Sequence, residues 1–327
     1  MKYISKGKGI YITKNATKLL DKIDGMIFDC DGVLVDVSKS YDLAIRQTVA
    51  FVLKKFANIE SIPITSQIIC GFKATGGFND EVDVTYASIL SLVAAKKIGA
   101  EPKKFIKKVL KNADETGISS VEKFLEKSKI DLRQIKEKLD YPGPHSTNPL
   151  YKIFDQIFYG PTLYKKIFHK KSQFAESGLI ENDKVLLTKH LLDILAKKYR
   201  RRLAIVTGRG KKSTSYSLAG LLKKFNLKHS IFLEDEPRKM AKPNPKSLVV
   251  SFDGLGTKCC LYVGDSMEDL IMAKRANSLG RKIVFCGIYG TADDPLAKKK
   301  FFKQNHAPLI LESIKLLPKA LNLVGKT

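Results

Sequence analysis

The stretch MIFDCDGVLVD, residues 26–36, is the most informative part of this sequence. If its apolar start ends a strand, successive side chains point to opposite faces, so Asp29 and Asp31 share a face and Cys30 points away. Two carboxylates so close repel each other unless a cation lies between them or one of them is protonated. The alternative is a plain strand end followed by a turn at Gly32.

The composition is that of an ordinary globular protein, and 327 residues are enough for two domains. No apolar run approaches the roughly 18 residues that span a bilayer; residues 87–95, ASILSLVAA, are among the longest. The basic N-terminus lacks the apolar centre of a secretory signal. The five cysteines form no CxxC pair, which suits a reducing compartment. We therefore expect a cytoplasmic protein without a membrane span.

The net charge of +25 allows a nucleic-acid or anionic-membrane partner, or simply lysines spread over solvated helix faces such as residues 102–112. The sequence contains no basic stripe interleaved with aromatic residues and no helix-turn-helix signature. Lys outnumbers Arg, whereas nucleic-acid sites favour Arg. These features argue against a nucleic-acid partner, but a positive field would still attract phosphorylated metabolites.

Hydrophobic periodicity predicts a helical insert within an α/β core. Apolar spacing near 3.6 predicts a helix beginning after Ser38 or Ser40. Further helices are predicted at 82–98, 102–112, 119–127, 132–139 and 185–198, with a loop at 140–149. After residue 200 the pattern predicts strands at 203–207, 230–234, 259–264 and 282–289, and helices at 213–225, 245–252, 267–277 and 309–322.

Short apolar strands that alternate with helices are typical of a doubly wound parallel sheet, as in Rossmann-like folds. We expect an α/β core of residues 1–36 and 196–327, with a possible extra strand at 9–13. A mainly helical cap domain, residues 37–195, is inserted after the first core strand.

Polar clusters follow four of the predicted core strands. They are DCDGVLVD with Asp29 and Asp31, VTGR ending at Arg209, AKPNP with Lys242, and GDSMED with Asp265 and Asp269. Ligands of such sheets bind outside the carboxyl ends of the strands, so we expect all four clusters to converge on one crevice.

These four motifs, in this order, resemble those of haloacid dehalogenase-like superfamily phosphatases of the phosphoglycolate-phosphatase-like branch, subfamily IA. The helical insert falls where that branch carries its cap. Within the insert, KATGGFNDEVDVTYA (73–87) is similar to a small archaeal and bacterial subgroup discussed near histidine biosynthesis. The resemblance implies a Mg²⁺-dependent phosphatase acting on a small phosphorylated metabolite.

The resemblance also assigns roles. Asp29 would be the nucleophile that forms an aspartyl-phosphate, and Asp31 would protonate the leaving oxygen and then activate water. Mg²⁺ would be held by Asp29, the backbone carbonyl of Asp31 and Asp265, with Asp269 acting through water or by orienting the other ligands. Because haloalkanoate dehalogenases lack an acid at the position of Asp31, its presence favours phosphoryl transfer.

For the phosphoryl group itself, Thr207 and the Gly208 N–H would bind its oxygens and Lys242 would neutralise its charge. Lys239 is the competing lysine, but the proline after Lys242 favours the latter. Arg209 would contact the substrate or form a surface salt bridge.

In the insert, we expect Gly76, Gly77 and Asn79 to contact the substrate, with Asp80 and Asp83 nearby, since glycines let backbone approach a ligand. The alternative is an ordinary glycine turn capped by Asn79 or Asp80. Residues 158–168 are a second possible contact.

Purely structural roles are the alternatives for several of these residues. Asp265 could be a helix N-cap with Asp269 an exposed acid of the first turn, and Thr207 with Gly208 could form a plain turn. A phosphomutase on the same core, a polyanion- or nucleic-acid-binding protein and a polynucleotide end phosphatase are the competing functions. Phosphoglycolate, histidinol phosphate and sugar phosphates are candidate substrates, and the oligomeric state is left open.

Overall fold

The computed structural model describes residues 2–60, 64–78 and 80–323. The chain divides into two compact units, Met1–Ser38 with Lys184–Thr327, and Lys39–Asp183. Residues 184–195, predicted to belong to the insert, are therefore part of the first unit. The reason is burial, since Leu191, Leu192 and Leu195 pack into the core of that unit.

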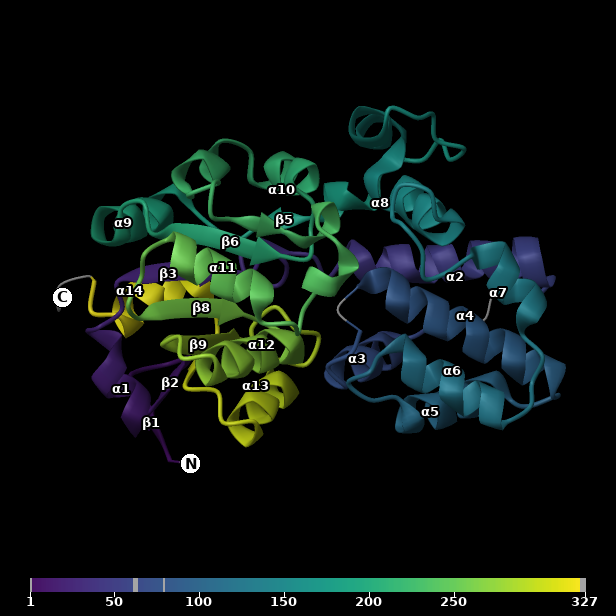
Figure 1. Cartoon of the computed structure of the whole chain (residues 1–327), viewed down its shortest axis with the longest axis horizontal. Helices are drawn as coiled ribbons and strands as arrows, with labels where there is room; N and C mark the ends of the chain where they lie inside the picture. Colours follow the sequence, from purple (N-terminus) through teal and green to yellow (C-terminus); the bar gives the residue numbers. More distant parts are fainter. Residues whose placement is uncertain (1, 61–63, 79, 324–327) are drawn as a thin grey trace. The chain divides into compact units, whose positions relative to one another are not determined.

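The first unit, the core unit, is built on an eight-stranded sheet (Figure 1). Its order is β1-β2-β10-β9-β8-β3-β6-β7, and the six strands from β10 to β7 are parallel. The N-terminal strands β1 and β2 extend one edge in antiparallel pairing. The bounds are β1 Tyr3–Ser5, β2 Ile10–Thr13, β3 Gly25–Phe28, β6 Leu203–Thr207, β7 Ile231–Phe232, β8 Cys260–Gly264, β9 Ile283–Ile288 and β10 Leu309–Leu311.

The strand order reverses at β3, which confirms the doubly wound α/β fold. From β3 the chain proceeds to β6 and β7 on one side, then returns to β8, β9 and β10 on the other. A reversal of this kind leaves a crevice at the carboxyl ends of the central strands. The clusters that follow β3, β6 and β8 are therefore brought to one edge of the sheet.

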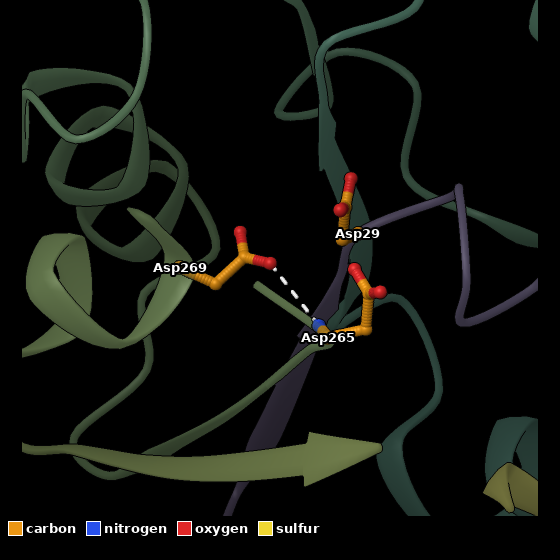
Figure 2. A group of neighbouring side chains, drawn as sticks. All are labelled: Asp29, Asp265 and Asp269. Carbon is orange, nitrogen blue, oxygen red and sulfur yellow. Dashed lines mark hydrogen bonds between the residues drawn. The ribbon is translucent and has the colours of Figure 1, made fainter. Parts of the chain in front are cut away.

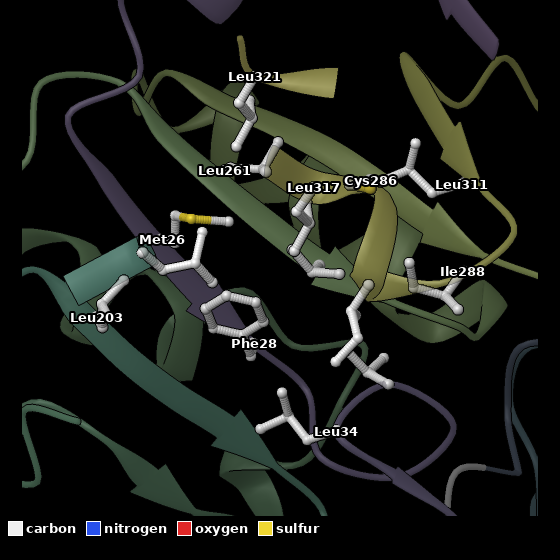
Figure 3. Close-up of a cluster of buried hydrophobic side chains, with 14 of the residues drawn as sticks. Met26, Phe28, Leu34, Leu203, Leu261, Cys286, Ile288, Leu311, Leu317 and Leu321 are labelled. Atoms are coloured by element: carbon white, nitrogen blue, oxygen red, sulfur yellow. The ribbon is translucent and has the colours of Figure 1, made fainter. Parts of the chain in front are cut away.

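Each face of this sheet is covered by its own helices. Met26 and Phe28 of β3 point into the core shown in Figure 3, with Leu261 of β8 and Leu317 of α14. Ile27 points into the opposite core with residues of α11, α12 and α13. The helices of the core unit are α1 Lys14–Leu20, α9 Lys189–Tyr199, α10 Lys211–Leu218, α11 Lys246–Gly254, α12 Met267–Ser278, α13 Pro295–Gln304 and α14 Leu317–Ala320.

The C-terminal prediction of one helix over 309–322 is wrong. Residues 309–311 form β10, which pairs with β9 and β2, and α14 is only a short helix. The run LILESIKLLPKAL has apolar spacing that suits a helix, but an unpaired strand edge beside β9 stabilises the extended form of Leu309–Leu311. Similarly, residues 219–224 form a 3₁₀ helix instead of continuing α10.

A small two-stranded sheet lies where the chain leaves and re-enters the core unit. Its strands, β4 Val35–Asp36 and β5 Lys184–Val185, pair antiparallel. Because residues 184–185 are extended, α9 begins at Lys189, later than predicted.

In the second unit, the helical insert, the described residues form helices and loops. Its α-helices are α2 Tyr41–Ala57, α3 Ser66–Ala74, α4 Glu81–Lys97, α5 Pro102–Asn112, α6 Ile118–Lys127, α7 Arg133–Leu139 and α8 Pro149–Phe168. The residue before α2 is Ser40, one of the two predicted caps. Helices α3 and α8 were not predicted, and α8 is broken at Gly160, where φ is 66°. Among the described residues, no helix is long and apolar enough to cross a membrane.

Candidate active site

Asp29 and Asp31 follow β3 directly, at the carboxyl end of the central strand. The Asp29 N–H donates to the Val263 carbonyl of β8 at 2.8 Å, so strand pairing continues up to the first carboxylate. Asp29 is buried, whereas the Asp31 side chain is 22% exposed. Cys30 lies in the hydrophobic core, as the alternation of side chains predicts.

The loop after β8 brings two further carboxylates to this edge. Ser266 is the N-cap of α12, and it exchanges hydrogen bonds with Asp269 in a capping box. Asp269 is fully buried. The alternative in which Asp265 caps the helix and Asp269 is exposed is therefore wrong, because the capping box turns Asp269 back towards the loop.

Three of these carboxylates lie within reach of a single ion. One oxygen each of Asp29, Asp265 and Asp269 lies within 4.8 Å of the other two. Figure 2 shows the carboxyl groups of Asp29 and Asp265 next to each other, with the Asp265 N–H donating to Asp269 at 3.1 Å. A set of carboxylate oxygens is the ligand chemistry that Mg²⁺ prefers.

Lys242 joins two of the three carboxylates. Its buried ammonium lies 2.9 Å from Asp29 Oδ1 and 2.8 Å from Asp269 Oδ1. Lys239 is exposed, so the structure brings Lys242 and not Lys239 to the acids. Asp29 Oδ1 also accepts from the Cys30 N–H at 2.8 Å. Oδ2 accepts no hydrogen bond from the described residues.

Asp269 is held by donors on both of its oxygens. Tyr262 donates to Oδ1 at 2.5 Å, beside Lys242. Oδ2 accepts from the N–H groups of Asp265 and Ser266, both at 3.1 Å, and from the Ser266 hydroxyl at 2.8 Å. Asp269 therefore fits the orienting role better than direct contact with a metal ion, since a bound ion would have to displace one of these donors.

The surroundings of the cluster shift the pKa values of its members in different directions. Burial raises the pKa of Asp29 well above the usual range; Lys242 lowers it, and the neighbouring carboxylates raise it further. Burial also raises the pKa of Asp269, but Lys242 and the hydrogen bonds it receives bring that pKa below its ordinary value. For Lys242, burial lowers the pKa, but Asp269 and Asp29 raise it overall. Lys242 therefore stays charged, and Asp29 is the carboxylate that an added cation would stabilise.

A charge count shows why a divalent cation fits. Lys298 of α13 lies 3.7 Å from Asp265 Oδ2. Asp29, Asp265 and Asp269 bring three negative charges together when ionised, and the ammonium groups of Lys242 and Lys298 offset part of this charge. A phosphate monoester adds about two more at neutral pH. The residues present therefore fit Mg²⁺, whose two positive charges would offset an incoming phosphate.

The strand β6 contributes Thr207, Gly208 and Arg209. Thr207 is fully buried, Gly208 is exposed, and the Arg209 N–H donates to Thr207 Oγ1 at 3.3 Å. The Arg209 side chain is buried, and its Nε donates to Asp31 Oδ1 at 2.5 Å. A surface salt bridge is therefore excluded for Arg209, because its guanidinium lies inside the fold.

Comparison with known proteins identifies the family. Residues 23–277 match the family model for haloacid dehalogenase-like hydrolases. The chain belongs to this family. The expectation drawn from the four motifs is thus confirmed, and the site at the end of β3 lies within the matched residues.

Solved structures with the same fold include a phosphatase from Thermococcus thioreducens, 20% identical, with a TM-score of 0.54 over 82% of this chain and 94% of that one. A haloacid dehalogenase-like hydrolase from Bacteroides fragilis is 17% identical, with a TM-score of 0.50 over 90% of this chain and all of that one. At these identities the likeness concerns the fold alone.

A curated relative is also found by sequence. An imidazoleglycerol-phosphate dehydratase from Phytophthora nicotianae is 29% identical over 141 residues. The matched region is 41% of this hydrolase and only 30% of that protein. The chain therefore corresponds to less than a third of the length of that relative.

Two glycines of the hydrolase make room for the acids. Gly32 has a φ of 70°, and a Cβ there would lie 2.5 Å from the Asp265 carboxyl group. A Cβ on Gly264 would lie 2.5 Å from Cβ, Cγ and Oδ2 of Asp269. Both positions thus need glycine for the close approach of a functional carboxylate.

We expect Gly264→Ala to destabilise the hydrolase by about 1–3 kcal/mol, the usual cost of overpacking a dense site. The added methyl group would push Asp269 away from Lys242. Gly220→Ala is the matched control, because a Cβ at Gly220 meets nothing within 4 Å. Thermal unfolding measures both variants; an unchanged unfolding temperature for Gly264→Ala would show that the loop accommodates the methyl group.

Sequence reasoning missed two contributors to the site. Tyr262 is a buried residue inside β8, and Lys298 lies on an unpredicted helix far from the four motifs. The one available signal for Tyr262 was a hydroxyl in an otherwise apolar strand three residues before Asp265. For Lys298 there was none among so many lysines.

The predicted substrate contacts of the insert lie between α3 and α4. Gly76 has a φ of 85°, and a Cβ on Gly77 would lie 2.4 Å from the backbone N of Gly117. Asp80 caps α4 by accepting from the Val82 N–H at 2.8 Å. The cap at Asp80 and the packing of Gly77 within the insert also fit the glycine turn of the alternative interpretation. Asn79 lies outside the described residues.

Proposed function

We propose that this hydrolase is a Mg²⁺-dependent phosphatase, which cleaves a phosphate monoester of a small metabolite through an aspartyl-phosphate on Asp29. The observation that carries the proposal is the convergence of Asp29, Asp265 and Lys242 at the carboxyl end of β3. It combines a reactive carboxylate oxygen, a second carboxylate for a shared ion and a buried cation. These three residues lie far apart in the sequence, and the fold brings them together at the carboxyl ends of the strands.

In the first half-reaction, Asp29 Oδ2 attacks phosphorus and the bond to the ester oxygen breaks. Asp31 gives its proton to that oxygen, and the alcohol leaves. In the second half, water attacks the phosphorus of the aspartyl-phosphate and passes a proton to Asp31. The bond to Asp29 breaks, phosphate is released, and both carboxyl groups return to their starting state.

The phosphoryl group needs positive charge and hydrogen-bond donors on its oxygens. Lys242 supplies charge next to the attacking oxygen, and Thr207 with the Gly208 N–H would bind the oxygens from the β6 side. Mg²⁺ would be held by Asp29, Asp265 and the backbone carbonyl of Asp31, with Asp269 fixing their orientation. When bound, it supplies the charge that lets an anionic ester enter among carboxylates.

The substrate class is proposed as a small phosphorylated metabolite. Phosphoglycolate, histidinol phosphate and sugar phosphates are the candidates, and the name of the curated relative, which refers to imidazoleglycerol phosphate, supports the imidazole-bearing one. By resemblance, the helical insert would recognise the leaving group, with Gly76, Gly77 and Asn79 as the proposed contacts.

A panel of phosphorylated metabolites, assayed with Mg²⁺ for release of inorganic phosphate, tests the proposal. We expect efficient release from at least one class of small ester. Release of phosphate also separates hydrolysis from a phosphomutase reaction, in which the phosphoryl group returns to another hydroxyl. If no ester releases phosphate, the proposed function is wrong.

Removal of the metal gives a separate prediction. With a chelator present, we expect hydrolysis to fall to background, since carboxylate repulsion then opposes the substrate. Mg²⁺ should restore it, and Ca²⁺ should restore it less, because Ca²⁺ prefers six to eight ligands at longer distances. As a readout independent of activity, Mg²⁺ should raise the unfolding temperature of the wild type but not of Asp265→Asn. An equal rise in both proteins would contradict the assigned ligands.

A further inference from the structure

The proposed mechanism gives no role to the side chain of Arg209, which contacts Asp31 in the core unit. Arg209 is among the largest fully buried side chains of the protein. Its Nε donates to Asp31 Oδ1, and its Nη1 donates to the Ser217 hydroxyl at 2.8 Å. A buried guanidinium must be hydrogen-bonded, so its contacts with Asp31 Oδ1 and Ser217 fix these side chains.

Arg209 itself is anchored by the segment around it. Its N–H donates to Thr207 Oγ1, and the next residue, Gly210, donates its N–H to Glu234 Oε2 at 2.9 Å. Ser217 lies two turns along α10, so it fixes the far end of the guanidinium. The arginine is thus held at its backbone and at its tip, while the Asp31 carboxylate at the other end is partly exposed.

We propose that Arg209 is a positioning residue, which holds the carboxyl group of Asp31 in the orientation needed for proton transfer to the leaving oxygen. Because Nε and Nη1 of Arg209 donate to Asp31 and Ser217, the guanidinium acts on the reaction through Asp31. This replaces the substrate-binding role expected from the sequence. The inference rests on the proposed function, since it assigns a role in that reaction.

The test is the dependence of kcat/KM on the leaving group. Aryl phosphates whose phenols range from acidic to weakly acidic, together with an alkyl phosphate, form the substrate series. Acidic phenols leave without a proton, whereas alcohols need one. Because kcat/KM covers the steps up to departure of the alcohol, it reports on the acid and not on the later attack of water.

In Arg209→Met we expect kcat/KM for the alkyl phosphate to fall about 10²-fold, the scale of a misplaced catalytic group. For the most acidic phenol it should stay close to the wild-type value, so the plot against leaving-group pKa becomes steeper. Arg209→Lys should lie between the two, since lysine keeps the charge but loses the planar fork. In an Asp31→Asn background, Arg209→Met should change the slope no further.

Arg202→Met is the matched control. Arg202 also belongs to the core unit and pairs with Asp24 at 3.1 Å, but both side chains are partly exposed. For Arg202→Met, the plot of kcat/KM against leaving-group pKa should have the same slope as for the wild type. If Arg209→Met does not fold, Ser217→Ala decides the question, because it removes the hydrogen bond at the tip of the guanidinium and keeps Arg209 itself; a steeper slope supports the inference and an unchanged slope overturns it.

Other outcomes separate the inference from the function beneath it. If Arg209→Met lowered kcat/KM equally for every substrate, Arg209 would act only on the fold. The same would follow if Arg209→Met changed the slope further in the Asp31→Asn background. The phosphatase function would then still stand. A wild type that hydrolyses no member of the series would overturn the proposed function, and the inference with it.

Discussion

Replacing Asp29 by asparagine is expected to lower the rate of phosphate-ester hydrolysis by about 10⁴-fold or more, the scale on which enzymes lose rate with their nucleophile. The amide has nearly the size of the carboxyl group, so the buried site keeps its packing. Its oxygen is not a competent nucleophile, and Asp269, the other carboxylate beside Lys242, is held by hydrogen bonds on both of its oxygens. Steady-state hydrolysis of an aryl phosphate with Mg²⁺ measures the effect.

Asp193→Asn is the matched control for this variant. Asp193 also lies in the core unit, but it forms an exposed pair with Lys224. The same chemical change there should leave the rate unaltered. Equal activity of Asp29→Asn and the wild type would show that another group attacks phosphorus, and circular dichroism verifies that both variants are folded.

Lys242→Met is expected to impair both stability and rate. The lysine is buried between Asp29 and Asp269, and removing one partner from a buried charge network costs about 3–5 kcal/mol. The loss of its charge beside the phosphoryl group should lower kcat by about 10²–10³-fold, as for other preorganised groups that stabilise a transition state. Chemical denaturation measures the first effect, and steady-state kinetics at saturating Mg²⁺ measures the second.

Lys239→Met provides the comparison within the same loop. Lys239 lies three residues earlier and is exposed, so we expect changes within about 0.5 kcal/mol in stability. If Lys242→Met and Lys239→Met had the same stability, the ion pairs of Lys242 with Asp29 and Asp269 would not stabilise the fold. If Lys242→Met lost rate but not stability, the carboxylates would have to be neutral in the resting protein.

The core of the fold was predictable because its strands are short, apolar and separated by helices. The residues that decide the site follow those strands directly, so Asp29, Thr207 and Asp265 could be placed at one edge from the sequence. By contrast, Leu309–Leu311 were predicted as helix, because their extended form depends on pairing with β9 and β2, which no local pattern encodes. Neither α8 nor its break at Gly160, where φ is 66°, was predicted.

Within the site, the sequence predicted which residue types converge but not how they pair. The proline after Lys242 made this residue a better candidate than Lys239, and the structure places Lys242 between two acids. The burial of Arg209 and its contact with Asp31 depend on how α10 folds back over the loop after β6. The role of Tyr262 could not be predicted, because nothing in an apolar strand sequence indicates which acid the hydroxyl group contacts.

The most direct test of the account is to trap the covalent intermediate. Borohydride reduces an acyl phosphate but not a free carboxylate, so acid-quenched enzyme that was turning over substrate with Mg²⁺ should yield homoserine at position 29. Peptide mass spectrometry locates the modified residue. Homoserine at position 29, absent when substrate is omitted, is the predicted result; rapid turnover with no modification there, or with modification at another acid, would contradict it.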